Sequence, residues 1–160
     1  MAVVAIKELK AVLPPKTRIL GIDQGEKTLG LALSNPELTL ATPLKTLPRI
    51  KFLENVKDLA VICCEYNVGA FVIGLPLNMD DSEGPRAQGV RHWVMNLLKE
   101  KKALGFEPPV AFFDERLSTF AAEDFLSEHN RMDRKRRDAI IDALAAANIL
   151  QGALDVMARS

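Results

Sequence analysis

The chain has few aromatic residues, few histidines and cysteines, and no net charge. Aromatic residues make up 6% of its 160 residues, and there are only two cysteines and two histidines. Lys and Arg together number 21, as do Asp and Glu, so the molecule as a whole presents no strong electric field to a polyanion. Any binding of a polyanion must therefore use a local patch of charge.

The scarce residues also exclude several kinds of site. Cys63 and Cys64 are adjacent in an apolar stretch, which is unsuitable for an ordinary disulfide and leaves zinc without partner ligands. His92 and His129 stand alone in the sequence, so we expect no His-based metal site. A G-x-x-x-x-G-K-[ST] phosphate loop is absent, and no Ser or Cys has a His relay in a nearby motif.

The N-terminal segment does not have the pattern of a targeting signal. Met1 to Leu13 lacks a basic start and is interrupted by charges at Lys7, Glu8 and Lys10. The same charges are unfavourable for a membrane span. We therefore expect a cytoplasmic protein with reduced thiols that does not cross a membrane.

Length and patterning predict one α/β domain, over residues 18–157, after an N-terminal arm over residues 1–17. The hydrophobic content of 48% is enough for one well-filled core. Apolar periodicity predicts strands at 18–23, 28–34, 38–44, 70–74 and 109–114, and helices at 50–66, around 90–98, at 118–129 and at 138–157. Short turns between the first three strands imply antiparallel pairing, and the later helices allow parallel crossovers. The expected fold is a mixed sheet flanked by helices.

Three acidic residues occupy positions where a carboxylate is hard to explain by structure alone. Asp23 ends an apolar strand pattern, Glu115 follows another, and Asp142 lies in a helical stretch on one stripe with Ala145, Ala146 and Ile149. An unpaired carboxylate in such surroundings needs a cation or a hydrogen-bonding partner. If these acids meet at one edge of the sheet, they form a metal site.

Other interpretations of these residues stay open at this level. Asp23 can be a simple turn former, and strand alternation means that Asp114 and Glu115 cannot both face the same way. Arg116 can pair with either acid or hold a phosphate. Asp138 can simply favour the positive end of the last helix.

A basic segment precedes the helix that carries Asp142. Residues 131–137 contain five cations and one anion, a local charge of +4. Such runs are often solvated loops, but the closeness of this one to Asp142 favours phosphate binding. The candidate substrate-binding residues are Lys27, Arg116, Arg134, Lys135, Arg136 and Arg137.

Four segments, in order, resemble the YqgF family, also called RuvX-like. They are residues 21–30 (GIDQGEKTLG), 72–77 (VIGLPL), 114–119 (DERLST) and 142–151 (DALAAANILQ). The resemblance runs from about residue 18 to residue 151. Gln24 and Glu26 depart from the expected pattern, and the segment before Lys16 is an extension.

The resemblance implies an RNase H-like fold with a central five-stranded mixed sheet. It also implies that Asp23, Glu115 and Asp142 form the catalytic, metal-binding triad, which selects Glu115 over Asp114. The implied activity is metal-assisted phosphodiester hydrolysis at the 5′ end of pre-16S ribosomal RNA, with ribosomal particles as possible partners. An older description of the family implies cleavage of four-way DNA junctions. Carboxylate oxygens suit Mg²⁺ or Mn²⁺, with two ions expected when substrate is bound.

Two rival functions follow from the same residues. Gly21-Ile-Asp-x-Gly25 also resembles the first phosphate motif of the actin, sugar-kinase and Hsp70 type of ATP-binding protein. Those proteins need two related lobes, whereas this chain has one copy of the motif. A non-catalytic nucleic-acid-binding module is the second rival, and acids at all three positions argue against it.

Overall fold

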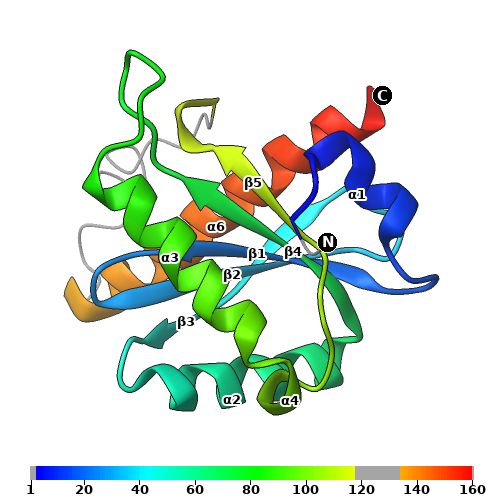
Figure 1. Ribbon diagram of the computed structural model, residues 1–160, viewed down its shortest axis with the longest axis horizontal. Helices are drawn as coiled ribbons and strands as arrows, with labels where there is room; N and C mark the ends of the chain where they lie inside the picture. Colours follow the sequence, from blue (N-terminus) through cyan, green and yellow to red (C-terminus); the bar gives the residue numbers. More distant parts are fainter. Residues whose placement is uncertain (1–2, 118–133, 160) are drawn as a thin grey trace.

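A central sheet with helices on both faces organises the protein in the computed structural model, which describes residues 3–117 and 134–159 (Figure 1). The strands are β1 (Arg18–Gln24), β2 (Thr28–Ser34), β3 (Ala41–Pro48), β4 (Val68–Leu75) and β5 (Val110–Asp114). Their order in the sheet is β3-β2-β1-β4-β5. β1, β2 and β3 pair antiparallel, whereas β4 is parallel to β1 and β5 to β4. The predicted five-stranded mixed sheet is confirmed.

The helices form two layers. On one face lie α2 (Phe52–Tyr66), α3 (Pro85–Lys99) and the short α4 (Lys101–Leu104); on the other lie α1 (Ile6–Val12) and α6 (Arg134–Ala158) (Figure 1). A 3-10 turn, η1, covers Glu115–Leu117. The parallel connections from β1 through α2 to β4, and from β4 through α3 to β5, follow the rule that parallel crossovers contain a helix.

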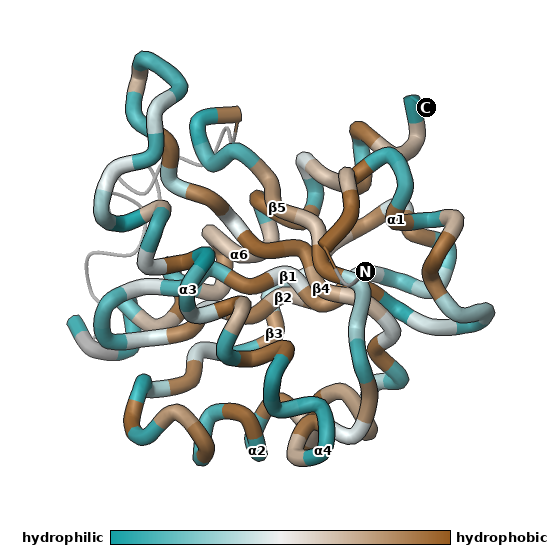
Figure 2. The backbone as a smooth tube through the Cα atoms, viewed as in Figure 1, coloured by the Kyte–Doolittle hydropathy of each residue, from teal (hydrophilic) through white to brown (hydrophobic). Residues whose placement is uncertain are grey.

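The two faces of the sheet each have their own apolar core. Side chains such as Leu20, Ile22 and Phe71 pack in the core below α2 and α3. Ile19 and Val72 belong to the other core, which is completed by α6. Adjacent strand residues therefore alternate between the two cores, and β1, β2 and β4 are buried along nearly their whole length. Figure 2 shows hydrophobic residues in the centre of the sheet.

Helix α6 is the main cover of the second face. Residues 136–158 are long and apolar enough to cross a membrane by length and composition. Ala146, Leu150 and Leu154 on this helix are buried against the sheet. Its apolar stripe is thus accounted for by the core of a globular domain.

Two segments differ from the sequence-based prediction, and a third cannot be compared with it. The third strand was expected at 38–44 but begins at Ala41, because the side chain of Asn35 accepts hydrogen bonds from the amides of Thr39 and Leu40 and extends the turn. The last helix begins by Arg134 rather than near residue 138, so the basic residues 134–137 are helical. The predicted helix at 118–129 lies outside the described residues.

The N-terminal segment contributes to the core. Leu9 of α1 is fully buried, and Val3 forms a bridge with Val110 of β5. Residues predicted as an arm therefore include a helix that packs against α6 and β5. Figure 1 shows α1 beside the C-terminal end of α6.

Candidate active site

Asp23, Glu115 and Asp142 come from three different elements. Asp23 is the penultimate residue of β1, Glu115 follows β5, and Asp142 lies on α6. Alternation from Ile19 places Asp23 on the α6 face of β1. Along β5, Ala111 and Phe113 face α6, so Asp114 points away from that face. All three acids therefore lie on the side of the sheet that α6 covers.

Two glycines make room for these acids beside Asp23. Gly30 of β2 pairs with Asp23 across the sheet, and Gly74 of β4 lies one residue past the Ile22–Ile73 pair. A Cβ at Gly30 would collide with the backbone oxygen of Asp142. A Cβ at Gly74 would lie 2.5 Å from the Oε1 atom of Glu115. Asp23 therefore lies between two glycines on neighbouring strands. The backbone of Asp142 packs over Gly30, and the carboxylate of Glu115 lies over Gly74.

The acids interact with one another. Asp23 and Glu115 share a side-chain hydrogen bond, and burial, followed by the charge of Asp23, raises the pKa of Glu115 to about 7. Burial also raises the pKa of Asp23, and the nearby negative charge of Asp142 adds to the increase. The hydroxyl of Thr28 donates a hydrogen bond to Asp142 Oδ2 at 2.8 Å. The pair of acids therefore retains a proton more readily than isolated carboxylates do.

One cation at this site was missed by the sequence analysis. The positive charge of Arg86 lowers the pKa of both Asp23 and Glu115, against the larger effect of burial. Arg86 is the second residue of α3, directly after Pro85. The sequence does contain a signal for Arg86. A Gly-Pro pair predicts a helix start here, and the preceding strand, β4, ends near the acids.

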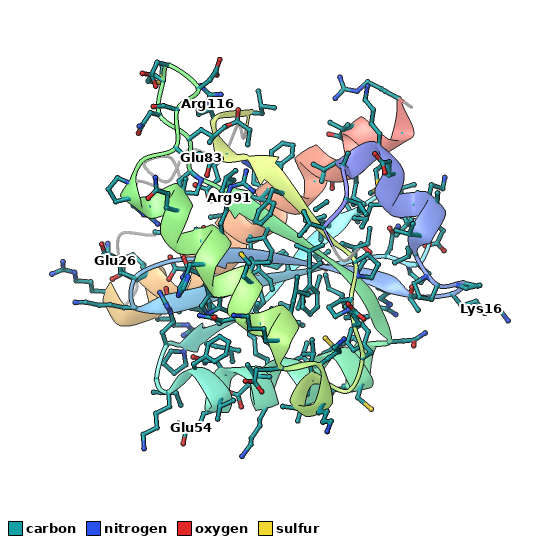
Figure 3. All side chains as sticks on the ribbon, in the orientation of Figure 1. Lys16, Glu26, Glu54, Glu83, Arg91 and Arg116 are labelled. Atoms are coloured by element: carbon teal, nitrogen blue, oxygen red, sulfur yellow. The ribbon has the colours of Figure 1, made fainter. Side chains whose placement is uncertain are left out.

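Arg116 is engaged in ion pairs. Its guanidinium lies 2.7 Å from Asp114 Oδ2 and 2.6 Å from Asp81 Oδ1, and it also donates to the backbone oxygen of Asn78 at 2.9 Å. The hydrogen bonds from Arg116 lower the pKa of Asp114. The bonds to Asp81 and Asn78 connect the end of β5 to the loop between β4 and α3, beside which Arg116 is labelled in Figure 3. The structure favours the ion-pair alternative for Arg116.

Four other predicted substrate-binding cations, Lys27, Arg134, Arg136 and Arg137, make no described contact with the acids, and the side chain of Lys135 lies outside the described part of the chain. Lys27 is exposed in the turn between β1 and β2. Arg134 and Arg136 are exposed at the start of α6, and Arg137 is partly buried with its Nε atom unpartnered among the described residues. At 1.5 Å per residue, Arg134 is about 12 Å along the helix from Asp142.

The acids do not form a finished metal site as they stand. Within residues 3–117 and 134–159, no three His, Cys, Asp or Glu side chains are grouped closely enough to hold a metal ion. Asp23 and Glu115 instead bond to each other, and Asp142 bonds to Thr28. Carboxylate oxygens are nevertheless the ligand type that Mg²⁺ and Mn²⁺ prefer.

A protein-family model decides the relationship of the chain. The model described as "RuvX: Holliday junction resolvase" matches residues 17–156, which is most of the sequence. The chain belongs to the RuvX family. The resemblance found in the four sequence segments is confirmed.

Relatives within the RuvX family are closely similar along almost the whole chain. A protein of Rhodospirillum centenum named "Putative pre-16S rRNA nuclease" is 50% identical over 155 residues, covering 97% of this chain and 82% of the relative. A protein of the same name from Roseobacter denitrificans is 48% identical over 145 residues, covering 91% of this chain and 86% of the relative.

Among solved structures, this RuvX-family chain is similar to T. thermophilus RuvC in complex with Holliday junction substrate. The TM-score is 0.55 at 18% identity, and the alignment covers 90% of this chain and 97% of RuvC. At this identity the similarity concerns the fold alone. It agrees with the RNase H-like architecture expected from the sequence.

Proposed function

We propose that this protein is a metal-dependent endonuclease that matures the 5′ end of pre-16S rRNA in the bacterial cytoplasm. The observation that carries the proposal is the convergence of Asp23, Glu115 and Asp142 on one face of the sheet. The names of its relatives support RNA as the substrate. Pre-rRNA within ribosomal particles is the proposed partner.

The three acids are the proposed metal ligands and catalytic residues. Burial and mutual repulsion disfavour the charged forms of Asp23 and Glu115, and a cation placed between them would remove that penalty. We assign Mg²⁺ or Mn²⁺ to this position, with two ions when substrate is bound. Such ions activate water and stabilise the leaving oxygen in phosphodiester hydrolysis.

Two of the acids have a defined structural support in this proposal. Thr28 orients Asp142 through its hydrogen bond to Oδ2. Gly74 leaves room for the Glu115 carboxylate over β4. Burial and the charge of Asp23 raise the pKa of Glu115 to about 7 in the absence of a metal, so binding of a cation has to displace a proton from this acid at lower pH.

Cleavage of four-way DNA junctions is the second candidate function. The description of the family model favours it, and so does the fold shared with RuvC. Both candidates use the same acids and differ in the substrate that the surrounding surface accepts. An ATPase of the actin type is disfavoured because the described residues form one sheet and one lobe.

Cleavage assays on the two substrates test the proposal directly. We expect the protein to cut a pre-16S rRNA fragment with a single-stranded 5′ leader, in Mg²⁺ or Mn²⁺ and not in excess chelator. Asp23→Asn, Glu115→Gln and Asp142→Asn should each lower the cleavage rate at least about a hundredfold, with losses that do not add. Asp138→Asn, four residues before Asp142 on α6, is the matched control.

The outcomes separate the alternatives. Undiminished cleavage in chelator would contradict metal dependence, and full activity of a folded triad variant would remove that residue from the site. Cleavage of the DNA junction alone would select the second candidate. RNA binding without cleavage of either substrate would identify a non-catalytic module, and Asp23-dependent ATP hydrolysis would favour the actin-like rival.

A further inference from the structure

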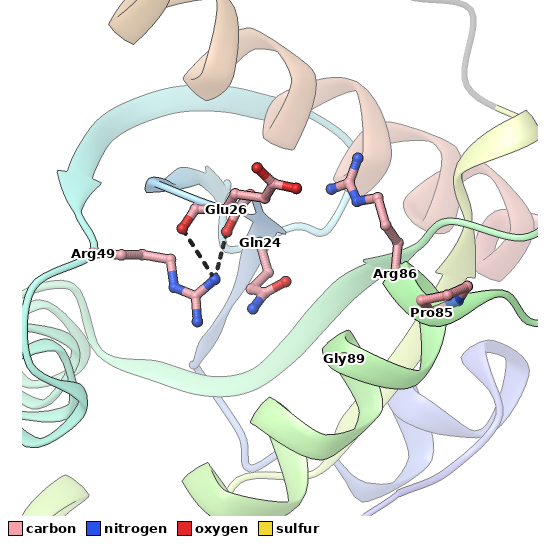
Figure 4. Close-up of a pocket in the computed structure, with 7 residues that line it drawn as sticks. Gln24, Glu26, Arg49, Pro85, Arg86 and Gly89 are labelled. Atoms are coloured by element: carbon pink, nitrogen blue, oxygen red, sulfur yellow. Dashed lines mark hydrogen bonds between the residues drawn. The ribbon is translucent and has the colours of Figure 1, made fainter.

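A pocket of about 340 Å³ lies beside the acids, between the β1–β2 turn and the start of α3 (Figure 4). Its lining residues are Gln24, Gly25, Glu26, Arg49, Pro85, Arg86 and Gly89. Gln24 directly follows Asp23, and Arg86 is the cation whose charge reaches both Asp23 and Glu115. By strand alternation Gln24 faces α3, whereas Asp23 faces α6. The pocket and the acids therefore meet at the end of β1 from opposite sides of the sheet, and the charge of Arg86 acts on both.

Gly89 has no packing reason to be a glycine. It lies inside the 15-residue helix α3, where glycine is less stable than alanine by about 0.5–1 kcal/mol. A Cβ built on Gly89 meets no atom of the described residues within 4 Å, unlike Gly21, Gly30, Gly69, Gly74 and Gly152, where helices or side chains pack closely. The missing side chain instead keeps one wall of the pocket open.

The pocket has a net positive lining. Arg49 and Arg86 extend into it from opposite sides, against one carboxylate, Glu26 (Figure 4). Arg49 Nη1 donates to the backbone oxygen of Gly25 at 2.7 Å, which holds the guanidinium against the turn. Arginine guanidinium groups bind phosphate well, and the glycines at 25 and 89 leave the volume between Arg49 and Arg86 free of side chains. The pocket therefore suits a phosphate group.

We propose that this pocket binds a backbone phosphate of the nucleic-acid strand, next to the phosphate that is cut. The assignment rests on the proposed function for its substrate class. Arg86 is the principal contact: it balances the acids in the free protein and turns to the phosphate when cations occupy the acids. Arg49 is the fixed contact, and Gly89 admits the sugar–phosphate backbone.

Binding of a 12-nucleotide single-stranded RNA tests the assignment without requiring cleavage. Fluorescence anisotropy is measured over a range of salt with Ca²⁺ present, and the RNA is checked for integrity. Arg86→Gln should lower the affinity about fivefold at 0.1 M salt and flatten the salt dependence by about 0.7, the value for one lost phosphate contact on a single strand. Arg86→Lys should retain most of the affinity.

A side chain added at Gly89 tests the same pocket without removing a charge. Gly89→Gln should fold at least as stably as the parent, because Gln has the higher helix propensity, yet bind RNA several-fold more weakly. Glu26→Gln should act in the opposite direction and bind RNA more tightly. Lys99→Gln and Met95→Gln, both exposed on α3, are the matched controls for a lost charge and an added glutamine.

Affinities of Arg86→Gln or Gly89→Gln equal to those of their controls would overturn the assignment, as would a parent protein that does not bind the RNA. Cleavage is a separate measurement. A protein that bound RNA through this pocket but never cut it would contradict the proposed nuclease function and leave the phosphate site standing.

Discussion

Glu115 and Asp23 form a hydrogen-bonded acid pair at a partly buried position, and this arrangement couples stability to pH. The folded protein keeps the Glu115 proton up to about pH 7, whereas the ordinary pKa is 4.5. Between these values the native state binds more protons than the unfolded state, so the free energy of unfolding falls as pH rises. The raised pKa of Asp23 acts in the same direction.

We expect the metal-free protein to lose on the order of 2–3 kcal/mol of stability between about pH 5 and about pH 8 through this pair. Glu115→Gln should remove most of that loss, because its amide does not titrate. Urea unfolding in chelator at the two pH values measures the effect, with the exposed Glu54→Gln as control. An unchanged pH dependence in Glu115→Gln would show that this carboxyl does not titrate as inferred.

The sequence alone located the acids but not their surroundings. Asp23, Glu115 and Asp142 stood out because apolar patterns predict buried positions where a carboxylate needs a partner. Strand alternation left Asp114 and Glu115 unresolved, and the structure resolves them: Asp114 pairs with Arg116, and Glu115 with Asp23. Arg86 was missed: the Gly84-Pro85 pair marks a helix start in the sequence, but the approach of Arg86 to the acids depends on where α3 begins relative to the end of β1.

At the scale of elements, the contact between β2 and α6 sets the position of Asp142. Gly30 lies directly beneath the backbone of Asp142, and Gly21 of β1 lies beneath Leu150, whose Cβ would be 2.8 Å from an added Cβ. Thr46 of β3 also donates a hydrogen bond to the backbone oxygen of Ala139. Helix α6, which carries Asp142, therefore packs closely on β1 and β2, next to Asp23.

Gly30→Ala should displace α6 from β2 and separate Asp142 from Asp23. We expect a loss of about 1–3 kcal/mol in unfolding free energy, the usual result of overpacking, together with reduced cleavage in the fraction that folds. Gly89→Ala is the matched control and should be stabilised, since no atom in residues 3–117 or 134–159 lies within 4 Å of its added methyl group. Equal stability of Gly30→Ala and the parent would mean that α6 can shift without cost.

Element boundaries were predictable only where apolar periodicity defined them. β2 agrees with the sequence pattern because buried residues continue to its end at Ser34, and α2 ends at Tyr66 as predicted, before Asn67 in the left-handed conformation. β3 starts late because the Asn35 side chain, rather than hydrophobicity, determines the turn. The start of α6 was misjudged because a basic surface helix carries no apolar period.

At the scale of the whole molecule, a neutral protein can bind a polyanion only through the distribution of its charge. The formal net charge is zero, with 21 cations against 21 anions. The order of elements was enough to predict a mixed sheet because antiparallel turns are short and parallel crossovers need helices. It could not predict which local cations face the acids, since that depends on the packing of α3 and α6.

The basic residues at the start of α6 are expected to attract the substrate backbone without reading bases. They come within two or three helical turns of Asp142, while the rest of the surface has no excess of cations. Replacing Arg134, Lys135, Arg136 and Arg137 with Gln should weaken binding to RNAs of unrelated sequence. The slope of log affinity against log salt should flatten by roughly 0.7–0.9 for each lost phosphate contact.

The matched control removes the same charge from other exposed positions, on α1, α2, α3 and α4: Lys10, Lys57, Lys99 and Lys102. Both quadruple variants change the net charge by −4, so a general electrostatic effect would weaken RNA binding equally in the two. If the segment contacts the backbone, only the α6 variant changes the salt slope, because only it loses counterion release at the interface. If the slope of log affinity against log salt were equal in both variants, residues 134–137 would be a solvated surface that does not contact the RNA backbone.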